Sequence, residues 1–157
     1  MKTATIIEIK RQLEKQNYQQ LLDYCLRLTK FKKENKELLS FLLFESDDLS
    51  DFVENVKKET AQHFMEINKT NIYFIRKSVR KILRNMNKYI RISSSKQVEA
   101  ELLIYFCNCL FSYSIPIKKS RQLTNLYDSQ LKKITAILSS LHPDLQYDLR
   151  RQMLKQA

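Results

Sequence analysis

The 157-residue chain contains no glycine. Average usage in globular proteins is about 7%, so roughly eleven glycines would be expected in a chain of this length. Glycine supplies the positive φ angles of tight hairpin turns and allows the backbone to approach a bound ligand closely. A chain without it cannot easily build tight β-hairpins. It also lacks the P-loop, the G-x-G-x-x-G turn and the G-x-S-x-G elbow, which argues against most nucleotide-binding and α/β-hydrolase functions.

The apolar residues recur at helical spacing almost throughout, and no stretch shows the alternation typical of strands. We expect about eight helices, over residues 5–16, 18–30, 34–44, 49–67, 71–92, 96–113, 121–141 and 143–155. Thr5 and Glu8 are placed as a capping box, Ser46-Asp47-Asp48 opens the fourth helix, and Ser94 with Gln97 can cap the sixth. The third helix is expected to bury Leu38, Leu39, Phe41, Leu42 and Phe44. The sixth is apolar nearly all round, which predicts that it is the most buried.

Short breaks between these helices predict antiparallel neighbours. The expected fold is therefore all-α, a single domain over residues 1–157, arranged either as a solenoid-like stack of helical hairpins or as an irregular bundle. The run of hairpins resembles HEAT, armadillo or TPR stacks in architecture only, since none of their consensus residues is present.

No apolar run approaches the roughly 20 residues of a membrane span, and the first residues do not resemble a secretory signal. The odd set of three cysteines, Cys25, Cys107 and Cys109, suits a reducing compartment better than a disulfide framework. These features predict a cytosolic protein.

The charge is distributed unevenly along the chain. The formal net charge is +11, and residues 69–96 contribute nine cations and no acid. Residues 45–68 just before them carry two cations and seven acids. The strongest functional lead is this basic stretch, which follows an acidic one.

On a helical wheel the apolar residues of 72–90 other than Tyr73 and Phe74 fall within an arc of about 100°, and Phe74 faces away from this stripe. Seven cations form a contiguous arc beside that stripe, and Tyr73 falls near its middle. These eight residues are the candidate contacts to an anionic partner: Tyr73, Arg76, Lys77, Arg80, Lys81, Arg84, Lys88 and Arg91. Cations neutralise phosphates and release counterions, and an exposed aromatic ring can stack on an unpaired base. Lys118, Lys119, Arg121, Lys132, Lys133, Arg150 and Arg151 could extend the surface.

The competing interpretation is a solvated helix face, neutralised by the acids of the fourth helix. Against it, a face without acids places like charges at i,i+4, which destabilises a helix by about 0.2–0.5 kcal/mol per pair. The two interpretations differ in one structural feature, namely whether those acids cover the basic arc.

Catalytic and metal chemistry find little support in the sequence. Glu59, His63 and Glu66 could share a helix face, yet the chain has no Glu-x-x-His motif of the kind that bundle di-iron sites use. Cys107 and Cys109 point about 160° apart on a helix and cannot chelate one zinc ion. We therefore expect His63 to be structural, both cysteines to be small buried residues, and His142 to cap the eighth helix. We expect no catalytic residue, metal ligand or cofactor.

The predicted function is a small, non-enzymatic helical binding protein whose basic helix contacts nucleic acid or another polyanion. An alternative is a protein-interaction scaffold that binds another protein or a second copy of itself. A more remote alternative is an enzyme with a site between helices.

Overall fold

The computed structural model describes residues 2–154, and within them the chain is all-α with no strand. The α-helices are α1 (Ile6–Leu13), α2 (Tyr18–Phe31), α3 (Lys33–Phe44), α4 (Leu49–Met65), α5 (Ile72–Ser93), α6 (Lys96–Ser112), α7 (Arg121–Leu138) and α8 (Pro143–Leu154), with a 3-10 turn η1 (Ile117–Lys119) before α7. The predicted fold class and the number of helices are confirmed. The predicted end of the last helix at Lys155 lies outside the described residues.

The chain divides into two compact units, residues 1–44 and residues 45–157. We call them the N-terminal and the C-terminal unit. Each has its own helix contacts, α2 with α3 in the first and α4 to α8 in the second. The single domain over residues 1–157 stays a prediction.

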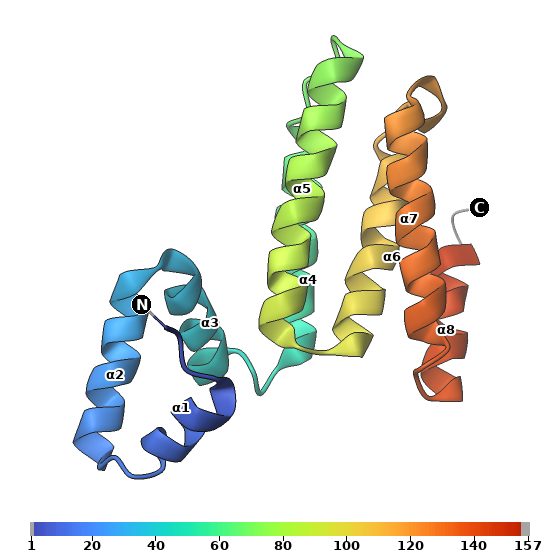
Figure 1. Cartoon of the computed structure of the whole chain (residues 1–157). Coiled ribbons are helices and arrows are strands. Elements are labelled where there is room, and N and C mark those ends of the chain that lie inside the picture. Colours follow the sequence, from blue (N-terminus) through green and yellow to red (C-terminus); the bar gives the residue numbers. More distant parts are fainter. Residues whose placement is uncertain (1, 155–157) are drawn as a thin grey trace. The chain divides into compact units, whose positions relative to one another are not determined.

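The C-terminal unit is built around α6. This helix contacts α4 and α5 on one side and α7 and α8 on the other, and successive helices alternate in direction (Figure 1). Nine of its residues are buried, including Leu102 and Phe106, which are fully inaccessible. The prediction that this helix is the most buried is confirmed, because an apolar surface all round needs neighbours on every side.

Local capping signals set several of the helix ends. The Thr5 hydroxyl accepts a hydrogen bond from the Glu8 amide while the Glu8 carboxylate accepts from the Thr5 amide, as predicted for a capping box. Asp48 caps α4. The predicted cap of α6 is wrong by one residue, because Ser95 accepts from the Val98 amide. Ser94 ends α5 in the left-handed conformation, with φ 51°, and is therefore occupied by the preceding helix.

The N-terminal unit overturns one burial prediction. Of the five α3 residues expected inside, only Phe41 is buried; Leu39 is half-buried, and Leu38, Leu42 and Phe44 are exposed. No residue of α1 or α2 is buried. The apolar spacing gave the correct helices, but no further layer of the unit covers their apolar faces.

Among residues 2–154, no helix has both the length and the apolar character needed to cross a membrane.

Candidate functional site

The basic surface is carried by α5, the longest helix. Asn71 caps it through a hydrogen bond from the Tyr73 amide (2.8 Å). Its buried residues lie at helical spacing and form most of the predicted stripe: Ile75, Val79, Ile82, Met86 and Ile90. Burial of this stripe in the C-terminal unit fixes which way the rest of the helix surface faces.

The seven predicted cations all lie at the surface of α5. Lys77, Arg80, Lys81, Arg84 and Arg91 are exposed, and Arg76 and Lys88 are half-buried. The Lys88 ammonium lies 5.0 Å from the centre of the neighbouring Tyr89 ring, within the range of a cation–π interaction. Burying one stripe therefore leaves the basic arc accessible to solvent along the whole helix.

The acids of α4 and its C-terminal cap residue, Glu66, interact with other groups. Glu54 pairs with Lys57 (2.9 Å), and Glu59 accepts a hydrogen bond from the Tyr89 hydroxyl (2.7 Å). Glu66 accepts one from the Gln62 amide nitrogen (2.7 Å).

Within residues 2–154, six of the seven cations form no ion pair with a carboxylate: Arg76, Lys77, Arg80, Lys81, Arg84 and Arg91. No direct ion pair with an acid of the fourth helix therefore neutralises these six residues.

Two of the arginines share a neutral acceptor on α7. The guanidinium groups of Arg76 and Arg80 donate to the side-chain oxygen of Gln122, at 2.5 and 3.4 Å. This contact positions both side chains without compensating their charge. It also brings the start of α7 to the basic helix, and the exposed Lys118, Lys119 and Arg121 immediately precede Gln122 in the chain. The basic surface therefore extends from α5 toward η1 and the first turn of α7.

An aromatic pair lies at the start of α5. Tyr73 is 55% exposed and Phe74 is 44% exposed. Their ring centres are 5.7 Å apart with an interplanar angle of 71°, an edge-to-face arrangement. The helical wheel placed both rings away from the core stripe, and their exposure agrees with that placement. Tyr73 can therefore offer a ring face or its hydroxyl to a ligand held by the cations.

The other chemistry-bearing residues are placed as follows. His63 is half-buried and lines a cavity of about 170 Å³ with Lys81 and Glu66. Within residues 2–154, no three histidine, cysteine or acidic side chains gather as a metal site would require. His142 is exposed, and its Nδ1 accepts from the Asp144 amide (3.3 Å), consistent with a capping role.

The two cysteines of α6 are buried, as predicted. Burial raises the pKa of the Cys107 thiol to about 12 and that of the Cys109 thiol to about 11. A nucleophilic cysteine must ionise near neutral pH, so these thiols are protonated under ordinary conditions and contribute packing.

Comparison with models of protein families, with curated proteins and with solved structures finds no match for this chain.

Gln122 is a member of the site that sequence reasoning missed. It is separated from Arg76 by 46 positions, and a lone glutamine on a helix carries no local signal. Tertiary packing alone identifies it. The lysines at the end of α2 and the start of α3 were also not singled out, although Lys30, Lys32, Lys33 and Lys36 are close together in the sequence.

Proposed function

We propose that the basic face of α5 binds nucleic acid through its phosphates. The observation that carries the proposal is the set of exposed cations on one helix that pair with no carboxylate among the described residues. Phosphate groups would supply the missing counter-charge and release the counterions that such a surface otherwise holds.

The charge pattern within α5 supports a role beyond solubility. Seven cations fall within sixteen residues and no acid lies among them. Arg76, Arg80, Arg84 and Lys88 follow one another at i,i+4, and each such like-charge pair destabilises a helix by about 0.2–0.5 kcal/mol. Surfaces that serve only solubility usually mix the two signs. A polyanionic ligand would relieve this repulsion on binding, and the relief would add to the free energy of binding.

The cations would contact phosphates, with Arg76 and Arg80 held in place by Gln122, and Tyr73 would stack on an unpaired base. A membrane surface fits less well. Peripheral helices insert their apolar face between lipids, and the apolar stripe of α5 is buried in its own unit.

Salt dependence tests the proposal directly. Fluorescence anisotropy with single-stranded DNA, RNA and duplex oligonucleotides would be measured between roughly 50 and 200 mM salt. If about four cations engage phosphates of duplex DNA, the log–log slope of affinity against salt should be about −3.6. Absence of binding at the lowest salt would overturn the proposal.

Charge-reversal variants localise the effect. Arg80→Glu with Arg84→Glu should abolish binding. Lys10→Glu with Arg11→Glu on α1 makes the same change of charge in the other unit and should reduce affinity only weakly. Equal losses in both double variants would mean that overall charge, and not the α5 face, drives binding.

Tyr73→Ala separates stacking from phosphate contact. Stacking of a base on an aromatic ring contributes about 1–3 kcal/mol, so this variant should lose single-stranded affinity and keep duplex affinity. An equal effect on both ligands would argue against the stacking role of Tyr73.

A further inference from the structure

The N-terminal unit exposes an unusual number of large apolar side chains. Along α1 and α2, Ile6 is 84% exposed and Phe31 76%. In α3, Leu43 is 64% exposed and Phe44 82%. Where exposed apolar side chains gather into one patch, the patch marks an interaction site.

Part of this surface forms a groove between α2 and α3. A single residue, Lys32, connects the two helices, and the Asn35 side chain donates to the Leu28 carbonyl (2.7 Å), which ties α3 to the end of α2. A cavity of about 200 Å³ between them has a mostly apolar lining: Cys25, Leu28, Thr29, Asn35, Leu38, Leu39 and Leu42.

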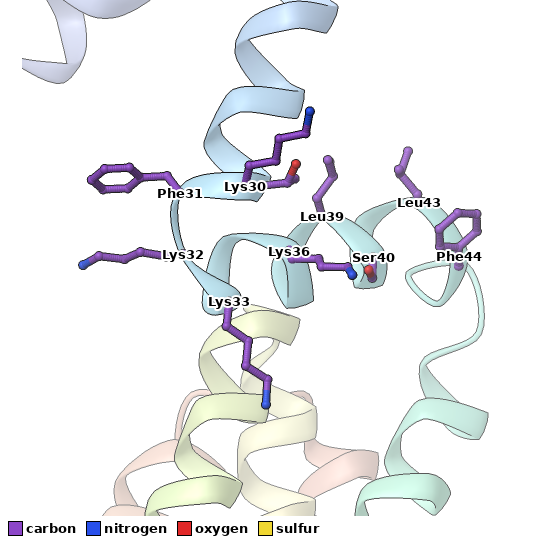
Figure 2. A pocket seen from close by; sticks show the side chains of 10 residues that line it. Lys30, Phe31, Lys32, Lys33, Lys36, Leu39, Ser40, Leu43 and Phe44 are labelled. Atoms are coloured by element: carbon purple, nitrogen blue, oxygen red, sulfur yellow. The ribbon is translucent and has the colours of Figure 1, made fainter.

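A second, larger cavity of about 620 Å³ shares Thr29 and Leu39 with the first and continues to Leu43 and Phe44. In Figure 2, Leu39 and Leu43 project from α3 to the same side as Lys30 of α2. The two cavities adjoin at Thr29 and Leu39, and we call them together the α2–α3 groove.

Lysines surround the larger cavity. Lys30, Lys32, Lys33 and Lys36 all line it and are all exposed. Lys36 runs along α3 toward Ser40 (Figure 2). Lys33 approaches the Glu37 carboxylate at 3.9 Å. No ion pair engages Lys30, Lys32 or Lys36 within residues 2–154. An apolar floor with a cationic rim complements a ligand that is apolar on one side and acidic on the other.

The first 68 residues of a second copy do not have that chemistry. Residues 1–44 carry nine cations and five acids, so two such units would repel one another. The acidic stretch of residues 45–68 uses its apolar residues Phe52, Val53 and Val56 in its own core. It has no apolar stripe left to place in the groove of another copy.

We propose that the α2–α3 groove binds an acidic amphipathic helix of a different protein. The apolar side chains of that helix would lie on Leu39, Leu42 and Leu43, as in other helix-in-groove complexes. Its carboxylates would meet Lys30 and Lys36, which sets the orientation and accelerates association. This site is separate from the basic face of α5.

Synthetic peptides provide the test with the full-length protein. The probe is a labelled helix of about 18 residues with leucine at i, i+3, i+4 and i+7 and glutamate at the other positions. One control has the same composition in shuffled order, and another has lysine in place of glutamate. The acidic amphipathic peptide should bind tightly, the shuffled peptide only weakly through its charge, and the lysine peptide not at all. Binding should also slow alkylation of Cys25, an exposed thiol that lines the groove.

Variants assign the binding to the groove. Lys30→Glu with Lys36→Glu should weaken binding at least about tenfold, and Leu39→Asp should abolish it. The lysine variant changes only exposed side chains, so it tests the site even if Leu39→Asp perturbs the fold. Arg80→Glu with Arg84→Glu should leave peptide affinity unchanged, which keeps this result independent of nucleic-acid binding.

Three results would overturn the proposal. The first is equal binding of the acidic and shuffled peptides. The second is unchanged affinity in the Lys30 and Lys36 variant. The third is self-association that protects Cys25 without peptide and disappears in Leu39→Asp, which would make a second copy the occupant of the groove.

Discussion

Both units of the chain consist of amphipathic helices, but the apolar faces are buried in one unit and largely exposed in the other. In the C-terminal unit, apolar stripes from several helices meet around α6, and residues such as Leu103 and Ile134 are almost completely buried. In the N-terminal unit, Phe41 is the only buried residue among those described. Amphipathic spacing forms helices in both, but a core needs a central element that contacts neighbours on several sides. Only the C-terminal unit has one.

Helix length increases the contrast. Isolated helices shorter than about 12–15 residues are marginal in water, and α1 spans eight residues and α3 twelve. Tertiary packing normally supplies the missing stability. In the N-terminal unit that packing is largely absent, so we expect a ligand in the α2–α3 groove to stabilise this unit more than the other.

Matched leucine truncations should show the largest difference between the units. Leu103 is 1% exposed and Leu43 is 64% exposed. Leu103→Ala leaves a cavity and should lower the free energy of unfolding by about 2–5 kcal/mol, whereas Leu43→Ala should change it by less than about 0.5 kcal/mol. Urea unfolding followed by far-ultraviolet circular dichroism measures both. A large loss for Leu43→Ala would mean that this face is covered in solution.

The stability of the two units should also depend on pH in opposite ways, because one loses stability at high pH and the other at low pH. This effect should be smaller than that of the leucine truncations. Burial raises the pKa values of Cys107 and Cys109 above their ordinary value of 9.0, to about 12 and about 11. The folded state then holds these protons more tightly than the unfolded chain. Their contribution to stability is present below pH 9 and is lost as the pH rises through about 11 to 12.

In the N-terminal unit, hydrogen bonds from the Thr5 amide and then from its hydroxyl lower the pKa of Glu8 below 4.5. The contribution of Glu8 to stability is present above that pH and is lost on acidification.

The raised pKa values of the two cysteines predict that the urea concentration at the unfolding midpoint of the reduced protein decreases as the pH is raised from about 8 to about 11. This decrease of the urea midpoint should be smaller in Cys107→Ala and should be unchanged in the control variant Cys25→Ala. A midpoint that stays constant to pH 11 would contradict this account.

Much of this contrast lies beyond what a sequence can predict. The capping box of Thr5 and Glu8 and the buried stripe of α5 follow from spacing within a few turns, and both were predicted correctly. The burial of Leu38, Leu42 and Phe44 was predicted from the same kind of spacing and is wrong. Periodicity identifies an apolar face, but whether another element covers it depends on residues far away in the chain.

The candidate site divides in the same way. The wheel predicted the one-sided arc from Arg76 to Arg91, and the exposure of Tyr73 agrees with its position on that arc. The shared acceptor Gln122 and the hydrogen bond from Tyr89 to Glu59 are tertiary contacts, which no local pattern encodes, whereas Glu66 accepts from Gln62 at i,i+4. The predicted cap at Ser94 was wrong by one residue. Ser94 ends α5 and Ser95 caps α6, and the spacing of the sequence alone does not show which serine has which role.

The smallest effect concerns two strained turns, both in the well-packed unit. Ser94 and Ser114 have φ of 51° and 53°, and no other described residue has a positive φ. This conformation is about 1–2 kcal/mol less favourable for a residue with a Cβ, whereas glycine adopts it freely. In a chain without glycine, packing around α6 must hold these serines in place. Ser94→Gly and Ser114→Gly should therefore each stabilise the protein by up to about 1 kcal/mol.

Ser139 provides the matched control, because it ends α7 with φ −62°. Glycine there gains no relief of strain and adds freedom to the unfolded chain, so Ser139→Gly should destabilise by about 0.5–1 kcal/mol. Urea midpoints of the three variants give the comparison. If all three substitutions lower the free energy of unfolding equally, Ser94 and Ser114 are not strained. The absence of glycine would then not destabilise the C-terminal unit at these turns.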